Sequence, residues 1–204
     1  MSAPVAERAP HPDPAPEFRR RLLDGLAACI QERGYRDTTV ADIVRCARTS
    51  KRTFYDHFST KEECFVELLS ANNEELVEAV RAAVDPGAGW QEQVRQAVTA
   101  YVDTIDANPA VTLSWIRELP ALGDAARPML RRGFGRLATM IVDLSTGPGF
   151  GRAGLAPLSP AVAVILVGGL RELTAQTVED GSPVTGIVEP AVAASIALLG
   201  GGHE

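Results

Sequence analysis

The chain has 204 residues, 46% of them hydrophobic and 23% charged, so it is long enough to form a helical domain with a real core beside a smaller domain. Its formal net charge of −6 at pH 7 is unexpected for a protein that binds nucleic acid. No run of roughly 18 apolar residues occurs without a glycine or a charge, which argues against a membrane-spanning helix.

Residues 1–16 contain five prolines and lack the apolar middle of a signal peptide. Such a segment cannot bury enough apolar surface to fold, so we expect a disordered arm. The absence of a secretion signal in this segment predicts a cytoplasmic protein.

The first predicted helix runs from about Glu17 to Arg33, and Gly34 stops it. Apolar residues recur along it at helical spacing and should form its buried face. That face comprises Phe18, Leu22, Leu26, Cys29 and Ile30.

A short second helix is expected to follow. Either Thr38 or Thr39 can cap its N-terminus, and Asp42 stands three residues after Thr39, close to a capping box. Arg48 and Thr49 then form a turn. The apolar stripe of this helix consists of Val40, Ile43, Val44 and Ala47.

The third predicted helix opens at Ser50, a favourable N-cap, and its Phe54 and Phe58 are spaced to face inward together. A short helix, a tight turn and a helix whose first turn is basic and hydroxylated are typical of a DNA-binding helix-turn-helix. The alternative is a helical turn that merely packs. The residues left on the other faces are Lys51, Arg52, Thr53, Tyr55 and His57.

From Phe18 to about Leu69 the chain resembles the DNA-binding domain of the TetR family of one-component transcriptional regulators. The resemblance covers about the first third of the chain, and the remainder matches that family only in length and in being helical. The motifs that carry it are residues 32–35 (Glu-Arg-Gly-Tyr), 37–43 (Asp-Thr-Thr-Val-Ala-Asp-Ile), 50–58 (Ser-Lys-Arg-Thr-Phe-Tyr-Asp-His-Phe) and 61–63 (Lys-Glu-Glu).

The resemblance implies that Lys51, Arg52 and Thr53 face DNA bases. It further implies that phosphates are held by Thr39, Ser50, Tyr55, His57 and Lys61.

Two positions depart from the family pattern, since arginines stand at positions 48 and 52, where the family usually has glycine. An arginine at a turn position that needs a positive φ costs roughly 1 kcal/mol. Both changes add positive charge where phosphates should lie. We therefore interpret them as tuning of DNA binding, and Arg48 joins the expected DNA-binding residues.

The distribution of charge favours this interpretation. Residues 17–61 hold ten Lys and Arg against six Asp and Glu, whereas the remainder holds ten against twenty. Positive charge is therefore concentrated in the segment that carries the motif, as binding to a phosphate backbone requires.

The three cysteines, Cys29, Cys46 and Cys64, follow no metal-binding or CxxC spacing. We expect all three to be buried and to behave as small hydrophobic residues, with a redox switch as the alternative. The histidines, His11, His57 and His203, are not placed to serve a nucleophile, which argues against an enzyme. We expect no metal site and no cofactor.

The rest of the chain predicts further helices and a long loop at 147–159, either a linker or a mobile cover over a pocket. The last two helices are rich in Ala, Val and Gly, and the resemblance implies that they form a four-helix dimer interface. Burial within the monomer is the alternative. Pro190 either kinks the last helix or makes it start near Val188. The expected ranges are 61–84, 90–106, 109–119, 124–145, 160–179 and 183–199.

A separate helical domain in such a regulator suggests a small-molecule pocket with a few polar groups on apolar helices. The composition favours an apolar or amphipathic ligand, and surface or structural pairing is the alternative for each residue. Arg171 and Glu172 are of most interest, because a charged pair that interrupts an apolar helix needs a partner or water. The candidate ligand-binding residues are Tyr101, Trp115, Arg117, Glu118, Arg171 and Gln176, with Asp103 and Glu172 nearby.

The sequence as a whole predicts an all-α protein with an arm at 1–16, a helix-turn-helix domain at 17–62 and a ligand-binding and dimerisation domain at 63–204. We expect a homodimeric repressor that binds a near-palindromic double-stranded DNA operator and is released by a small molecule. The alternatives are an activator or a ligand-free regulator of the same fold, and a helical interaction protein that no longer binds DNA.

Overall fold

The computed structural model describes residues 15–200, so the predicted arm lies almost entirely outside the described residues. Within 15–200 the chain forms ten α-helices and two short 3₁₀ helices and no β-strand, which confirms the all-α prediction. The first helix begins at Ala15, two residues before its predicted start.

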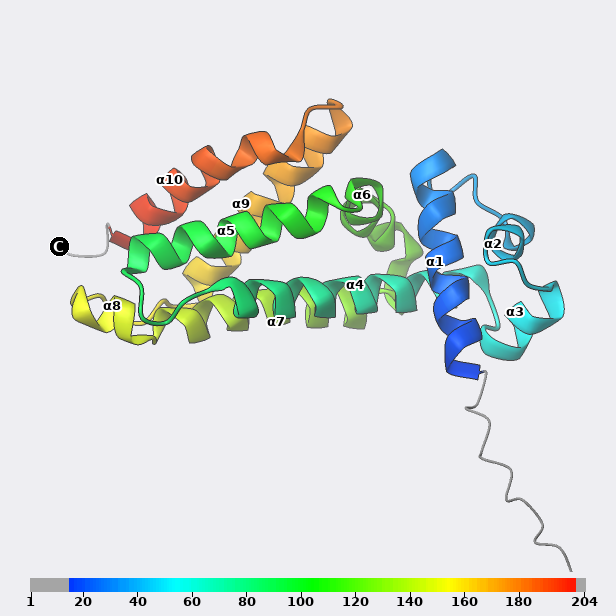
Figure 1. Cartoon of the computed structure of the whole chain (residues 1–204), viewed down its shortest axis with the longest axis horizontal. Helices are drawn as coiled ribbons and strands as arrows, with labels where there is room; N and C mark the ends of the chain where they lie inside the picture. Colours follow the sequence, from blue (N-terminus) through cyan, green and yellow to red (C-terminus); the bar gives the residue numbers. More distant parts are fainter. Residues whose placement is uncertain (1–14, 201–204) are drawn as a thin grey trace, which may run out of the picture.

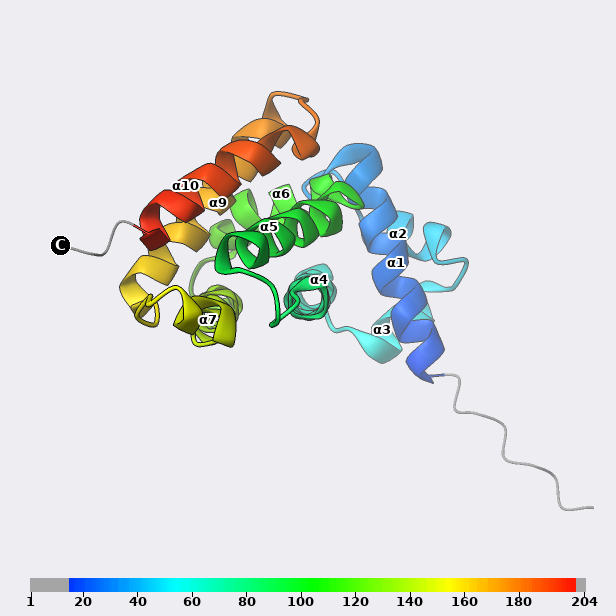
Figure 2. The same cartoon turned by 60° about the vertical axis from the view of Figure 1, so that its left-hand side comes forward.

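The N-terminal helices form a unit at one end of the elongated molecule (Figure 1). In Figure 1 α1 lies between α2 and the body of the molecule, and α2 and α3 lie at the outer end, while the turned view of Figure 2 shows α3 beside the lower end of α1. These elements are α1 (Ala15–Arg33), α2 (Val40–Cys46) and α3 (Lys51–His57).

The body of the molecule is a bundle of longer helices. In it α4 packs against α5 and α7, while α9 packs against α6 and α7. Its elements are α4 (Lys61–Ala83), α5 (Trp90–Asp106), α6 (Pro109–Arg117), η1 (Leu119–Ala125), α7 (Arg127–Ser145), α8 (Pro148–Arg152), α9 (Pro160–Glu179), η2 (Val184–Ile187) and α10 (Val188–Gly200).

Helix α4 belongs to both parts of the molecule. Its first turns bury Phe65 and Leu69 in the same core as Leu22 and Phe54, and the Phe65 ring stacks on that of Tyr35 with 3.8 Å between ring centroids. Its later turns lie within the bundle, against α5 and α7 (Figure 1). The helix therefore runs through the boundary expected at residues 62 and 63.

The segment predicted as a loop at 147–159 is a loop only in part, because α8 occupies its first residues. Pro148 stands at the first position of this helix, where its missing N–H is harmless. Phe150 is buried and lies 6.0 Å, between ring centroids, from Trp90. A single buried aromatic anchors this turn, and one apolar residue gives no periodicity from which a helix could be predicted.

The start of the last helix settles the alternative left open for Pro190. Helix α10 begins at Val188, so Pro190 lies in its first turn, where a proline removes no intrahelical hydrogen bond. The late-start prediction is confirmed.

The expectation that all three cysteines are buried is wrong for Cys46. Cys29 and Cys64 are fully buried, but Cys46, the last residue of α2, is exposed. The buried stripe of that short helix is made by its other apolar residues, and Cys46 falls beside the stripe.

Helices α9 and α10 expose apolar side chains. Val164, Ile165 and Leu198 are 47%, 60% and 48% exposed. Among the helices of residues 15–200, α9 alone is long and apolar enough to cross a membrane by length and composition. The same composition suits an interface helix, and α9 packs along α6 and α7 in the folded bundle.

Candidate functional site: a helix-turn-helix and an apolar cavity

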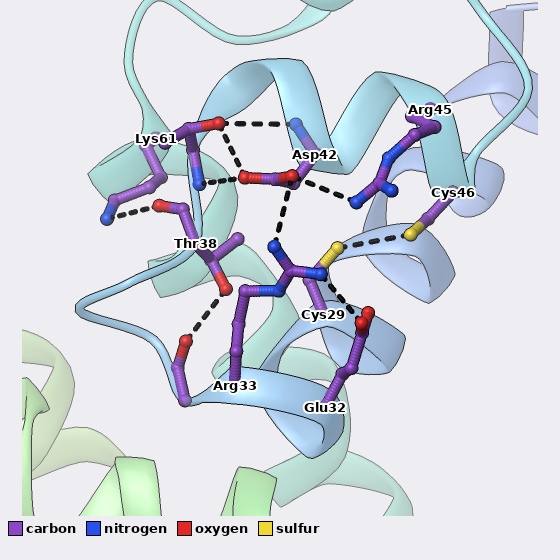
Figure 3. Close-up of polar contacts among 10 residues, drawn as sticks. Cys29, Glu32, Arg33, Thr38, Asp42, Arg45, Cys46 and Lys61 are labelled. Atoms are coloured by element: carbon purple, nitrogen blue, oxygen red, sulfur yellow. Dashed lines mark hydrogen bonds and ion pairs between the residues drawn. The ribbon is translucent and has the colours of Figure 1, made fainter.

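The N-terminus of α2 is closed by the predicted capping box. The Thr39 side chain accepts a hydrogen bond from the Asp42 backbone N–H at 3.3 Å, and Asp42 Oδ2 accepts from the Thr39 backbone N–H at 3.1 Å. Arg33 and Arg45 also donate to Asp42 Oδ1 (Figure 3). The bonds from Thr39, together with the two arginines, lower the pKa of Asp42 below its usual value. This network fixes the start of α2.

The turn between α2 and α3 has the geometry expected from the family pattern. Arg48 has a φ of 51°, the one positive value among non-glycine residues in 15–200. The family's usual glycine would adopt this conformation freely, whereas arginine is strained there. The sharp turn is thus retained, and it carries an exposed positive charge.

Helix α3 is held from inside by its two phenylalanines. Ser50 caps it through a 3.0 Å bond from the Thr53 backbone N–H. Phe54 and Phe58 are buried, with 5.7 Å between ring centroids. The predicted inward pair is confirmed.

The remaining residues of α3 face outward to different degrees. Lys51 and Arg52 are exposed, and Tyr55 is 58% exposed. Thr53 and His57 are half-buried. The structure therefore brings these five candidate DNA-binding side chains onto one short helix at the outer end of the molecule (Figure 1).

Lys61 is placed differently from the prediction. Its Nζ donates to the carbonyl oxygens of Tyr35 and Thr38 at 3.1 and 2.9 Å and lies 4.2 Å from the centre of the Tyr35 ring. These contacts join the start of α4 to the segment before α2, and Figure 3 shows the bond to Thr38. The phosphate contact that the resemblance implies for Lys61 stays a prediction.

Two arginines of α1, which the sequence analysis missed, hold the turn and the C-terminal end of the helix-turn-helix. Arg21 Nη2 donates to the carbonyl oxygens of Ala47 and Arg48 at 2.7 and 2.9 Å. Arg19 pairs with Glu67 of α4 and donates to the His57 carbonyl oxygen at 3.1 Å. The run of three arginines at 19–21 was the available signal, but only the fold shows that two of them point at backbone carbonyls.

An apolar cavity of about 100 Å³, open to solvent on one side, lies inside the helical bundle. Helices α4, α5, α7, α9 and α10 all contribute to its wall, together with α8. Its polar lining residues are Gln93, Tyr101, Ser145, Arg171 and Ser195. A mostly apolar wall with a few polar groups is typical of the lining of a small-molecule site.

Tyr101 and Arg171 stand between this cavity and a second one of about 70 Å³, since both residues line both spaces. The Tyr101 hydroxyl lies 3.0 Å from Thr174 Oγ1, and burial raises its pKa. Two of the predicted ligand-binding residues therefore do lie at the cavity wall.

The Arg171 side chain is only partly satisfied. Its Nη2 donates to the Ile116 carbonyl oxygen at 2.9 Å, whereas its buried Nε has no partner. Burial, with the nearby charge of Arg117 adding to it, lowers the pKa of Arg171. Its sequence neighbour Glu172 is bonded elsewhere, to Arg117. The cavity wall thus contains a cation with unused hydrogen-bonding capacity.

Trp115 lines the second cavity, but three other predicted ligand-binding residues lie elsewhere. Arg117 forms ion pairs with Glu172 and Glu179. Glu118 pairs with Arg36, and Gln176 is exposed and donates to Glu172. Arg117, Glu118 and Gln176 line neither of these two cavities and bond to residues of other helices or to Glu172, so their role in ligand binding stays a prediction.

Comparison with known proteins agrees with this architecture. Residues 22–68 match the family described as bacterial regulatory proteins, tetR family. Over 93 residues, 46% of this chain, the chain is 32% identical to the transcriptional activator FasR of Mycolicibacterium smegmatis, covering 42% of that protein. Over 109 residues, 53% of this chain, it is 33% identical to the transcriptional repressor KstR2 of Mycobacterium tuberculosis, covering 54% of it. The chain thus spans about half the length of these relatives.

Solved structures match over nearly the whole chain. The fatty acid degradation regulator FadR from Bacillus halodurans superposes with a TM-score of 0.77 at 18% identity, covering 97% of this chain and all of that one. FadR from Bacillus subtilis in complex with stearoyl-CoA has a TM-score of 0.74 at 16% identity, covering 90% of this chain and 99% of its own. At these identities the likeness shows a shared fold.

The matched relatives are named as helix-turn-helix transcriptional regulators, and the part of the chain that aligns with them carries the motif described above. With this match and the capped helix-turn-helix, residues 22–68 form a DNA-binding domain of the kind found in the tetR family of bacterial regulatory proteins.

Proposed function

We propose that the protein is a homodimeric transcriptional repressor that binds a near-palindromic DNA operator through α3 and is released from it by a small molecule. The observation that carries the DNA part is the first turn of α3, where Lys51 and Arg52 are exposed while Phe54 anchors the helix from below. Side chains at this position of a recognition helix reach base edges in the major groove. Binding to chromosomal DNA implies a cytoplasmic location.

Two copies are needed to read two half-sites, and the exposed apolar face of α9 and α10 offers the surface that joins them. Val164, Ile165 and Leu198 are the large side chains on this face. Small residues beside them, such as Ala161 and Ala194, allow close helix contact. A two-fold axis through this face would relate two α3 helices.

The apolar cavity supports a ligand with a long apolar part and an acidic group. The apolar part would fill the space between α5, α7 and α9, and the acidic group would meet the unused Nε of Arg171. Two proteins of the same fold were crystallised in complex with stearoyl-CoA and with lauroyl-CoA. We therefore propose an acyl-chain ligand, with an acyl-CoA as its most direct form.

The contacts between the two parts of the molecule suggest how a ligand would act on DNA binding. Helix α6 lines the second cavity and packs on α1. Arg36, just after α1, pairs with Glu118 at the end of α6 at 2.7 Å, and Gln31 donates to Asn108 at its start. A ligand that displaces α6 or α4 would move α1 and with it α3. By linkage, operator DNA must then weaken ligand binding by the same factor.

The DNA proposal is tested by selecting bound duplexes from a random library with the full-length protein. We expect a near-palindrome whose half-site centres are about one helical turn or a small multiple apart. Arg52→Ala should lose about 1–3 kcal/mol at one base position, provided the contact is bidentate to guanine. Selected pools without a shared sequence would contradict the proposal, and equal weakening on all sequences would reduce Arg52 to a phosphate contact.

The ligand proposal is tested by calorimetry with lauroyl-CoA, with free coenzyme A as the control ligand. Leu137→Trp should abolish binding by filling the cavity, and Arg171→Gln should weaken it, whereas the surface variant Arg127→Gln should bind as the wild type does. Equal affinity in the presence and absence of the selected operator would contradict the release mechanism while leaving DNA binding intact.

One relative gives a specific reason to keep a second candidate function. FasR, 32% identical over the matched segment, is named an activator. The same DNA-binding fold can therefore serve either sign of regulation. A reporter under the selected operator, with and without the protein, separates repression from activation.

A further inference from the structure

Two cysteines far apart in the sequence meet at the junction of α1 and α2. Cys29 Sγ and Cys46 Sγ are 3.2 Å apart (Figure 3). Cys29 lies within α1 and is fully buried, whereas Cys46 is the last residue of α2 and is exposed. The pair therefore combines one sulfur that a solute can reach with a second sulfur directly behind it. Cys64, which is also buried, has no such access.

We propose that Cys29 and Cys46 form a peroxide-sensitive dithiol, whose oxidation to a disulfide weakens DNA binding. The effect on DNA rests on the proposed function, but the thiol chemistry does not. A bond between these sulfurs needs them to come about 1 Å closer, since a disulfide measures about 2.05 Å.

The oxidation proceeds in two balanced steps with hydrogen peroxide as the oxidant. Cys46 attacks one peroxide oxygen, the O–O bond breaks, and Cys46 becomes a sulfenic acid while one water is released. Cys29 then attacks Cys46 Sγ and displaces hydroxide, which takes the Cys29 thiol proton and leaves as a second water. Two thiols are oxidised by two electrons in total, and one peroxide is reduced.

The surroundings of the two sulfurs assign this order. Burial, with the contact to Cys46 adding to it, raises the pKa of Cys29 to about 12, so this thiol stays protonated while the exposed sulfur reacts. A sulfenic acid formed on Cys46 would find its resolving thiol already at van der Waals contact. This proximity favours the disulfide over further oxidation of Cys46.

The packing beside the pair explains why the bond would disturb DNA binding. One turn before Cys29, a Cβ built on Gly25 would lie 2.9 Å from the Ile43 carbonyl oxygen and 3.0 Å from the Ala47 backbone nitrogen. The two helices therefore already touch there and cannot simply move closer. Pulling Cys46 inward must tilt the end of α2 about this contact.

That tilt acts on the turn that positions α3. The residue after Cys46 is Ala47, and the carbonyl oxygens of Ala47 and Arg48 are held by Arg21 of α1. Movement of α2 against α1 strains these hydrogen bonds and changes the orientation of α3, the helix that follows. We expect operator affinity to fall by about tenfold, within the usual range of couplings between protein sites.

The test treats the reduced full-length protein with hydrogen peroxide and measures mass and DNA binding in parallel. The intact mass should fall by two hydrogen atoms. Tryptic peptides 22–33 and 46–48 should become joined, while peptide 62–81, which carries Cys64, should remain open to alkylation. Reduction with dithiothreitol should restore both the separate peptides and the original affinity for the selected operator.

Serine variants supply the matched controls. Cys29→Ser and Cys46→Ser should each lose the peptide cross-link and the response of DNA binding to peroxide, whereas Cys64→Ser should retain both. Sulfinic acid on Cys46 without a cross-link would overturn the proposal, and so would a disulfide with unchanged operator affinity. If the reduced protein binds no DNA at all, the proposed function fails, but the cross-link result still decides the dithiol chemistry.

Discussion

Arg21 of α1 donates a 2.9 Å hydrogen bond from Nη2 to the carbonyl oxygen of Arg48, the non-glycine residue with a φ of 51°. The helix-turn-helix is thus held at its strained turn by a neighbouring helix. The strain is tolerated because the packing of α2 and α3 on either side fixes the backbone conformation of the turn. A substitution of Arg48 by glycine should therefore change the stability of the fold and its affinity for DNA in opposite directions.

Replacing Arg48 by glycine should raise the free energy of unfolding by roughly 1 kcal/mol, because glycine adopts a positive φ without strain. The same change should weaken operator binding, because it removes an exposed positive charge. Urea unfolding and fluorescence anisotropy measure the two effects. Arg48→Ala is the matched control, since it loses the charge but keeps the strain. Equal stability of the two variants would contradict the strain argument.

Gly25→Leu should destabilise the DNA-binding helices by roughly 1–3 kcal/mol, since no side chain fits between α1 and α2 at this position. Ala28→Leu, on the exposed side of the same helix, is the control and should change stability little. Urea unfolding followed by circular dichroism compares the two. Unchanged stability in Gly25→Leu would mean that the helices can separate without cost.

The capping box of α2 predicts a dependence of stability on pH. Because the folded state lowers the pKa of Asp42, its stabilising effect is fully present above the ordinary aspartate pKa of about 3.9 and is lost as pH falls through the folded value. The wild type should therefore have a higher melting temperature than Asp42→Asn at neutral pH, and this difference in melting temperature should shrink in acid. Thr39→Val should remove part of the effect. A difference constant from neutral to acid pH would contradict this account of the cap.

Ile165→Glu should convert a dimer into monomers, because it puts a charge at the centre of the exposed apolar face of α9. Sedimentation equilibrium would measure the change. Thr139→Glu, exposed on α7, is the control and should leave the dimer intact. If Ile165→Glu remains a dimer, the dimer interface must lie on another face of the molecule.

Much of the DNA-binding end could be predicted from sequence because its signals are local. Caps at Thr39 and Ser50 and the pair Phe54 and Phe58 each depend on residues a few positions apart. The positive φ at position 48 could not be predicted from the neighbouring residues. It was predicted from the resemblance to known regulators, which usually have glycine there.

The cavity could not be predicted in the same way, because its wall comes from helices far apart in the sequence. Arg171 was found because it interrupts an apolar helix, but Arg117 and Glu118 carry the same signal and pair at the surface instead. The contact between Cys29 and Cys46 likewise depends on how α1 crosses α2. Their spacing in the sequence fits no CxxC pattern and therefore gave no sign of this contact.

The central claim is that the exposed basic first turn of α3 binds operator DNA. Its most direct test is the affinity of the protein for the DNA upstream of its own gene and its neighbours, measured by fluorescence anisotropy at two salt concentrations. Lys51→Ala/Arg52→Ala is the test variant. Arg81→Ala/Arg95→Ala, which removes two exposed charges from α4 and α5 outside the helix-turn-helix, is the control.

We predict tight wild-type binding that weakens steeply as salt rises, through counterion release. The test variant should lose this binding, and the control should keep it. Equal binding by both double variants, or no bound DNA even after genome-wide selection, would contradict the account.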